Sequence, residues 1–262
     1  MISSDKLQFI TETLKQTAEA VVRLKGRKAE YTDVKGYLAE ADLLSHDVIT
    51  SAIRSQWASD DVHSEESQTG QSLSHRKGAR TWILDPICGT TNYVRGIPFY
   101  AHSICVLDDD GVLAAGIYHP SMDELFLADR KQTTVNGRIV RVSETSRLDL
   151  ALIDVNCNQS AYQNDEEQIV GIVKKLAPPA TRRLRIMESA NLEMAYVACG
   201  RIDGYVNPDD KVWDIAAGSL MIASAGGFSE LQRGSIHQLS QCRGVFAANK
   251  YLFNALKSVF RN

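Results

Sequence analysis

The pattern of apolar and polar residues changes character along this chain of 262 residues. Apolar side chains recur at helical spacing over residues 4–24 and again over residues 40–57, with polar and charged residues between them. This spacing predicts two amphipathic helices. The polar residues 27–38 between them are expected to form a mobile connection. Residues 64–75, rich in Ser, Gln and Gly, are expected to form a loop.

Short apolar runs separated by turn residues predict strands in the middle of the chain. These runs cover residues 81–85, 99–107, 111–118 and 123–129. Asn136-Gly137 separates two further runs and is a strong signal for a hairpin with a two-residue turn.

The remainder of the chain alternates between predicted strands and predicted helices. The strands cover residues 150–155, 182–187, 203–207, 227–232 and 245–249, and the helices cover residues 166–177, 189–200, 213–225 and 250–260. An antiparallel front half joined to an alternating back half predicts a layered α/β fold. We expect an N-terminal α+β subdomain over residues 1–146 and a C-terminal α/β subdomain over residues 147–262. The boundary between them is soft enough for both to share one core.

Composition narrows the class of protein. A hydrophobic fraction of 44% excludes a disordered chain, and a net charge of −3 gives no basic field for binding nucleic acid. No apolar run approaches the length of a membrane span, so no membrane partner is expected. The five cysteines are odd in number and widely spaced, which argues against a disulfide framework or a zinc knuckle. Because the start of the chain lacks a basic segment followed by an apolar one, we expect a cytoplasmic protein.

The densest chemical signal is the segment Trp82-Ile-Leu-Asp-Pro-Ile-Cys-Gly-Thr-Thr-Asn. It places the carboxylate of Asp85 at the end of a strand, beside a turn with free backbone N–H groups. If a helix begins there, those groups favour an anion such as phosphate. The same residues also fit a strand, a tight turn and an N-capping Thr that bind nothing.

Other acidic residues occur at the ends of predicted elements. Glu65 and Glu66 lie in a polar loop, whereas Asp214 and Asp42 stand near the starts of helices, where an acid can simply interact with the helix dipole. A Mg²⁺ site needs convergent oxygen ligands, so these acids form one only if the fold brings them together.

Taken in order, these segments resemble the inositol monophosphatase family, within the superfamily of Mg²⁺-dependent, lithium-sensitive phosphatases. The matching segments are Glu-Ala-Asp, Ser-Glu-Glu-Ser, Trp-Ile-Leu-Asp-Pro-Ile-x-Gly-Thr-Thr-Asn-Tyr and Trp-Asp-Ile-Ala-Ala-Gly. Further matches, such as Val-Asn-Gly-Arg, extend over most of the chain. The resemblance implies a layered α-β-α-β-α sandwich that assembles as a homodimer.

The resemblance also implies a role for each matching residue. The first Mg²⁺ would be held by Glu65, Asp85 and the carbonyl of Ile87, and a second would lie between Asp85, Cys88 and Asp214. Asp42 and Thr90 would position or activate the attacking water, and the amides of Gly89 and Thr90 would bind phosphate oxygens. Glu188, Ser189 and Asn207 would lie on the substrate side. The implied reaction is in-line attack of a metal-activated water on phosphorus, without a covalent intermediate.

Four departures from the family pattern bear on activity. Cys88 replaces a carboxylate of the second metal site, and a neutral thiol is a poor Mg²⁺ ligand. Asn207 replaces an acid that contacts substrate hydroxyls, and Glu188 replaces a Gly. The segment of residues 35–42 is short, with Ala39 in place of the usual Thr.

Two interpretations of these departures remain open. In the first, the protein is a Mg²⁺-dependent phosphomonoesterase that acts on a small phosphorylated polyol, sugar or nucleotide. In the second, it is a catalytically weakened or repurposed relative that binds a phosphorylated ligand or performs different chemistry at the same site. Retention of Glu65, Asp85, Thr90 and Asp214 favours the first interpretation.

Overall fold

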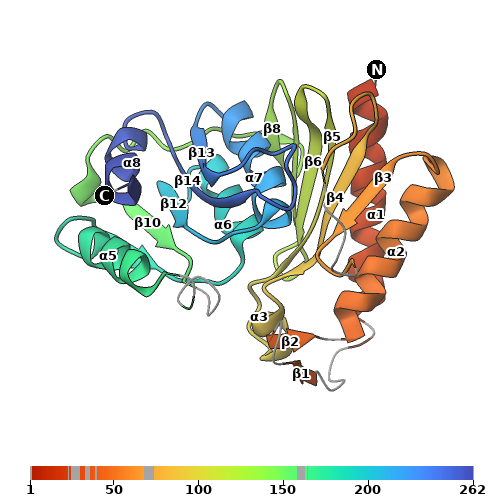
Figure 1. Ribbon diagram of the computed structural model, residues 1–262, viewed down its shortest axis with the longest axis horizontal. Coiled ribbons are helices and arrows are strands. Elements are labelled where there is room, and N and C mark those ends of the chain that lie inside the picture. The colour runs from red at the N-terminus through yellow and green to blue at the C-terminus, as the bar shows by residue number, and fades with distance from the viewer. Residues whose placement is uncertain are drawn as a thin grey trace.

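The computed structural model describes residues 2–22, 24, 30–32, 36–38, 40–67, 74–157, 163 and 165–261. The elements stack in five layers, as Figure 1 shows. Helices α1 (Ile2–Val22) and α2 (Glu40–Gln56) cover the outer face of a seven-stranded sheet. Helices α6 (Ala190–Ala198) and α7 (Val212–Ser224) lie between this sheet and a five-stranded one, and α5 (Glu166–Leu176) and α8 (Phe253–Arg261) cover the far side. This order confirms the predicted α-β-α-β-α sandwich.

The seven-stranded sheet follows the order of the chain. Its strands are β3 (Asp61–Ser64), β4 (Thr81–Cys88), β5 (Ala101–Asp108), β6 (Gly111–His119), β7 (Glu124–Asp129), β8 (Thr133–Val135) and β9 (Arg138–Ile139). Strands β3 and β4 are parallel, and the later neighbours are antiparallel. The predicted hairpin is confirmed, because Val135 pairs with Arg138 across Asn136 and Gly137, whose φ angles are both positive.

The five-stranded sheet has the order β11-β10-β12-β14-β13. Its strands are β10 (Leu152–Val155), β11 (Arg183–Arg185), β12 (Gly204–Asn207), β13 (Phe228–Arg233) and β14 (Arg243–Ala248). Strand β10 is parallel to both of its neighbours, whereas β14 is antiparallel to β12 and β13. Two short helices complete the described elements: α3 (Thr90–Val94) and the 3-10 helix η1 (Leu148–Leu150).

Three strands differ from the prediction. Strands β1 (Glu30–Thr32) and β2 (Gly36–Leu38) form a small antiparallel hairpin within the segment expected to be a mobile connection. Strand β3 was not predicted, because a four-residue strand without clear alternation gives little local signal. It forms through pairing with β4, which begins twenty residues after β3 does.

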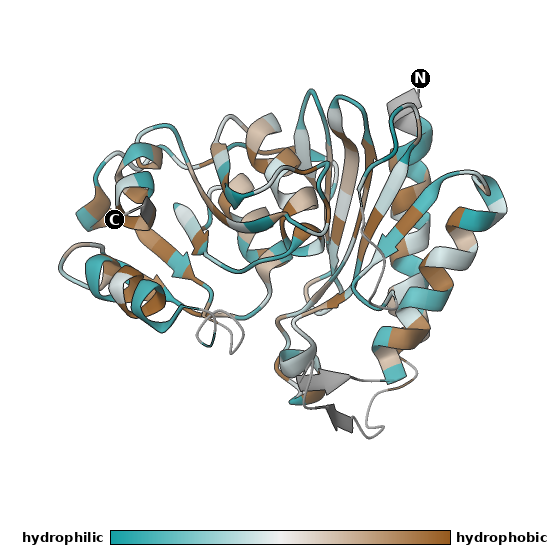
Figure 2. Ribbon diagram, viewed as in Figure 1, coloured by the Kyte–Doolittle hydropathy of each residue, from teal (hydrophilic) through white to brown (hydrophobic). Residues whose placement is uncertain are grey.

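Hydrophobic residues from both predicted subdomains pack in one cluster. It includes Ile83 and Phe126 from the seven-stranded sheet, Met194 and Met221 from the central helices, and Val245 from the other sheet. In Figure 2 the brown of hydrophobic residues recurs on α7 and the adjacent strands, whereas α2 and α5 alternate teal and brown as amphipathic helices do. Residues on both sides of residue 146 therefore share a hydrophobic core, and the division into two subdomains at this position stays a prediction.

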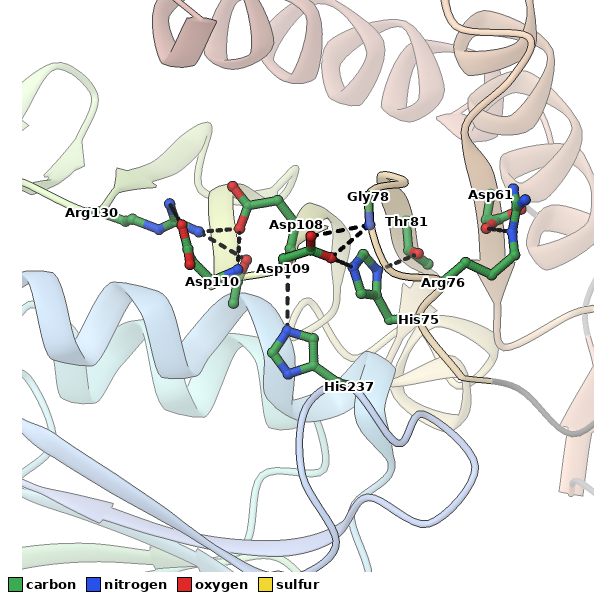
Figure 3. A network of polar contacts seen from close by, with 11 residues as sticks. Asp61, His75, Arg76, Gly78, Thr81, Asp108, Asp109, Asp110, Arg130 and His237 are labelled. Atoms are coloured by element: carbon green, nitrogen blue, oxygen red, sulfur yellow. Dashed lines mark hydrogen bonds and ion pairs between the residues drawn. The ribbon is translucent and has the colours of Figure 1, made fainter.

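A polar network fastens the segment that leads into β4 (Figure 3). The ring of His75 contacts Thr81 Oγ1 at 3.0 Å and Asp109 Oδ1 at 2.9 Å. The backbone N–H of His75 donates to the carbonyl of His237, whose ring in turn contacts the carbonyl of Asp108. These bonds join the two halves of the chain at the N-terminal end of β4.

Among the described helices, none combines the length and the apolar character needed to span a bilayer.

Candidate functional site

A small pocket of about 180 Å³ opens at the carboxyl end of β4. Elements from both halves of the chain surround it. The described lining residues are Glu65, Glu66, Asp85, Ile87, Cys88, Gly89, Thr90, Thr91, Asn156, Glu188, Ala190, Asp210 and Asp214. The acids that the sequence scatters over separate segments therefore lie around one cavity.

Parallel pairing of β3 and β4 explains how Glu65 reaches this place. Ser64 at the end of β3 lies opposite Leu84, and the N–H of Glu65 donates to the carbonyl of Leu84 at 3.2 Å. Glu65 and Asp85 thus leave their strands at the same edge of the sheet. Their convergence follows from topology, since the carboxyl ends of parallel strands meet at one edge.

Strand β4 becomes irregular where it enters the pocket. Its pairing with β5 shifts register between Asp85 and Cys88, because Pro86 has no N–H to continue the ladder. Gly89 follows with a φ of 93°, and a Cβ at this position would lie 2.9 Å from the backbone oxygen of Glu188. Glu188 itself has a φ of 63°, a conformation that non-glycine residues rarely adopt. The turn therefore brings two backbone segments into unusually close contact beside the pocket.

Thr90 connects the pocket to the start of α2. Its Oγ1 lies 3.0 Å from Asp42 Oδ1 and 3.0 Å from the carbonyl oxygen of Ile87. A hydroxyl has one hydrogen, so it donates to one of these two acceptors at a time. Asp42 is buried, at 2% exposure. Asp42 and Thr90 are therefore in contact, and their role in positioning the attacking water stays a prediction.

The charged side chains that line the described part of the pocket are all acidic. Six of its described lining residues carry carboxylates, and none of those described is basic. Burial, followed by the charges of Glu65 and Asp214, raises the pKa of Asp85 well above its usual range. Burial also raises the pKa of Asp214 to about 6. Without a cation, these acids oppose one another.

The donor set fits one hard divalent cation. Asp85 Oδ1 is buried and has no hydrogen-bond partner among the described residues, which leaves it free to coordinate. Together with the carboxylate of Glu65 and the carbonyl of Ile87 it offers oxygen ligands of the kind that Mg²⁺ takes. The predicted first metal site is therefore chemically consistent with the residues present.

Cys88 fits that role poorly. Its Sγ and the carboxylate oxygens of Asp85 and Asp214 all lie within 4.8 Å of one another, so the three residues do converge. Burial, reinforced by the two neighbouring acids, raises the pKa of the thiol well above its usual range. The sulfur is thus a neutral, soft atom at a position where a hard cation prefers an anionic oxygen.

Two residues predicted on the substrate side are buried behind the pocket lining. The Ser189 hydroxyl donates to the carbonyl of Cys88 at 3.0 Å and so holds the turn. Asn207 is fully buried, and its amide donates to Asp210, which lines the pocket. Their contacts with a substrate, like that of Glu188, stay predictions.

The sequence did not identify five of the described lining residues as part of the site. These residues are Glu66, Thr91, Asn156, Ala190 and Asp210. Asn156 carries a usable signal, because a polar residue directly after a buried parallel strand lies at the edge where ligands bind. Asp210 follows Pro208 and Asp209 and looks like a turn residue; only packing shows that it is buried and that Tyr205 donates to it at 2.7 Å.

The buried histidines lie outside this lining. His63, His102 and His119 are not among the described residues of the pocket, and burial lowers the pKa of each, that of His102 to about 4. Neutral rings bonded to backbone carbonyls, as in His102 and His119, agree with the structural role expected for them. Ala39 and Lys35, which mark the shortened segment, lie outside the described residues.

Comparison with known proteins agrees with the geometry. A model described as "Inositol monophosphatase family" matches residues 4–261. The chain belongs to the inositol monophosphatase family. It is 31% identical over 226 residues to the inositol-1-monophosphatase of Rhizobium meliloti, a match covering 86% of this chain and 83% of that protein. It is 30% identical over 247 residues to a Pseudomonas aeruginosa protein named Nus factor SuhB, covering 90% of this chain and 87% of that one.

A solved structure shows the same fold. The inositol monophosphatase from Anabaena (Nostoc) sp. PCC 7120 has a TM-score of 0.83 to this chain at 26% identity. The alignment covers 99% of this chain and 96% of that one. The five-layered sandwich described above is thus the fold of the family.

Proposed function

We propose that this protein is a Mg²⁺-dependent phosphomonoesterase that hydrolyses a small phosphorylated polyol, sugar or nucleotide. The observation that carries the proposal is the pocket with six carboxylates and no basic side chain among its described lining residues. A phosphate would be repelled by such a surface unless a divalent cation lay between them. The family relationship supplies the reaction class, since relatives named inositol monophosphatases share this chain's length and fold.

Glu65, Asp85 and the carbonyl of Ile87 would hold the cation. When bound, Mg²⁺ supplies charge neutralisation for the phosphoryl oxygens and lowers the pKa of a coordinated water. Magnesium fits better than zinc or copper, because these three donors are hard oxygens.

The chain's own groups do the remaining work. The Thr90 hydroxyl, shared between Asp42 and Ile87, can accept a hydrogen bond from a water molecule while donating to the Asp42 carboxylate. This orients the water and gives its proton a path toward a buried acid. The amides of Gly89 and Thr90, at the start of α3, would donate to phosphate oxygens, because the first N–H groups of a helix lack intrahelical partners.

The substrate would be small, since the cavity holds about 180 Å³. Polar groups of Asn156 and Asp210 line it and suit a ligand with hydroxyl groups. We further propose that the protein works in the cytoplasm as a homodimer and does not require nucleic acid.

A second candidate is binding without efficient turnover. It is favoured by the neutral thiol of Cys88 at a metal position, and several relatives carry the name Nus factor SuhB rather than that of a phosphatase. In this case the pocket would recognise a phosphorylated ligand, or the chain would act through a partner, without hydrolysis.

Phosphate release distinguishes the two candidates. We expect release from at least one member of a panel of phosphorylated cyclitols, sugars and nucleotides, dependent on added Mg²⁺ and lost in Asp85→Asn. Glu144→Gln, a change of an exposed carboxylate outside the pocket, serves as the matched control and should keep full activity. Absence of release from the whole panel at every Mg²⁺ concentration would reject the phosphatase proposal and leave the binding role.

A further inference from the structure

Asn191 lies behind the pocket and contacts two of the three residues at the second metal position, Asp85 and Cys88. It is fully buried in the first turn of α6. Its side-chain Nδ2 donates to Asp85 Oδ2 at 2.9 Å and to the carbonyl of Trp213 at 3.2 Å, and its backbone N–H donates to Cys88 Sγ at 3.3 Å. The side-chain nitrogen faces two oxygen acceptors, which fixes the orientation of the amide.

These bonds give Asp85 Oδ2 a partial positive partner. The hydrogens of an amide carry positive charge, so they stabilise the negative charge on Asp85 Oδ2. They would also repel a cation placed beside them. The two carboxylate oxygens of Asp85 thus differ: Oδ1 has no hydrogen-bond partner among the described residues, whereas Oδ2 accepts a hydrogen bond from Asn191.

The remaining ligands at the second position are weak. Asp214 Oδ2 already accepts a hydrogen bond from the N–H of Lys211 at 2.9 Å. The Cys88 side chain is buried, at 4% exposure, and its soft sulfur already accepts a hydrogen bond from the N–H of Asn191. Among these residues, Asp214 would thus be the one anionic ligand of a second Mg²⁺ that the first ion does not also use. The second ion would also lie next to the amide of Asn191, a hydrogen-bond donor.

We infer that Asn191 and Cys88 together replace the second divalent ion, so that this protein holds one ion, at Asp85 Oδ1, Glu65 and the carbonyl of Ile87. Asn191 is a positioning residue in this arrangement: it orients Asp85 toward the single ion by occupying the other side of the carboxylate. The inference rests on the proposed function, because both require that the first position bind a divalent cation.

The test is the number of Mn²⁺ ions bound per chain, measured by titration with detection of free Mn²⁺ by electron paramagnetic resonance. We expect one ion for the unchanged protein, with any second ion bound roughly 100-fold more weakly. The double variant Cys88→Asp with Asn191→Ala restores a carboxylate and removes the amide, so it should bind two ions. Cys88→Asp alone keeps the amide and should bind the second ion less tightly than the double variant.

Cys157→Asp is the control, because it adds a carboxylate at a half-buried cysteine outside the pocket and should leave the count at one. If the double variant does not fold, Asn191→Asp replaces the donor by an acceptor of the same shape and should gain the second ion. Two ions of similar affinity in the unchanged protein, or one ion in the folded double variant or in Asn191→Asp, would overturn the inference. Absence of any bound Mn²⁺ in the unchanged protein would instead reject the proposed function, and the inference with it.

Discussion

Replacing Asp85 by Asn should stabilise the metal-free protein while it destroys the metal site. Asp85 is 1% exposed, and its carboxylate lies within 4.8 Å of that of Asp214. At an effective dielectric constant of about 20, two full charges at that distance repel by about 3.5 kcal/mol, which is an upper limit because the raised pKa values let protonation relieve part of the repulsion. The Asn side chain removes this repulsion and keeps the shape of the carboxylate.

Part of the gain is lost elsewhere. The hydrogen bond from Asn191 to Asp85 now ends on a neutral oxygen, which weakens it by about 1 kcal/mol. The net gain is therefore at most about 2.5 kcal/mol, and for a chain of this size it should raise the melting temperature by up to about 10 °C.

The assay is thermal unfolding followed by circular dichroism near neutral pH, with EDTA and separately with saturating Mg²⁺. In EDTA, Asp85→Asn should melt above the unchanged protein, whereas Asp110→Asn, at an exposed carboxylate, should not shift. With Mg²⁺ the unchanged protein should gain stability through ligand binding, and Asp85→Asn should not. A variant that melts below the unchanged protein in EDTA, or that is still stabilised by Mg²⁺, would refute the view of the pocket as a set of opposed acids.

Three further expectations concern pH, packing and chemistry. Burial raises the pKa of Asp214 from 3.8 to about 6, so the folded metal-free protein binds the proton of this carboxyl more tightly than the unfolded chain does. The free energy of unfolding, taken relative to that of Asp214→Asn, should therefore fall by up to about 3 kcal/mol as pH rises from about 4 through 6. Denaturant titration in EDTA measures this change. Gly116→Ala should destabilise the folded protein by about 1–3 kcal/mol, since a Cβ there would lie 2.3 Å from Ile10 Cγ2. Gly171→Ala, on an open helix face, should stabilise it by about 0.5–1 kcal/mol. Equal effects of the two variants in the same titration would contradict the packing described. Thr90→Val should lower kcat for phosphate release roughly 100-fold while Thr90→Ser retains activity, and an unaffected Thr90→Val would exclude the hydroxyl from the reaction.

Much of the fold could be predicted from sequence because its elements carry strong local periods. The helix α1, the strands β4 to β7 and the Asn136-Gly137 turn each read correctly from a few neighbouring residues. Strand β3 could not be predicted, since what stabilises it is a partner strand supplied by another part of the chain.

The candidate site likewise combines residues from one short sequence segment with residues from distant segments. Asp85, Ile87, Cys88, Gly89 and Thr90 are consecutive or nearly so, and one strand end presents them together. Their convergence with Glu65 and Asp214 could be expected through the family resemblance alone, because no local pattern specifies distance between segments.

Asn191 shows why the remaining residues escaped prediction. It lies in a helix of mostly apolar residues, where a single Asn looks like an ordinary polar position. Its importance comes from where α6 packs against β4, which determines that the amide lies against Asp85 and Cys88. Asp210 is similar: the sequence gives a turn, and the packing around Tyr205 makes it a buried pocket acid.

The acidic pocket should bind phosphate only through a divalent cation. Isothermal titration of the protein with inorganic phosphate, once in Mg²⁺ and once in EDTA, tests it most directly. We expect measurable binding in Mg²⁺, no binding in EDTA, and no binding by Asp85→Asn in either buffer. Phosphate binding of equal affinity in EDTA and in Mg²⁺ would contradict it.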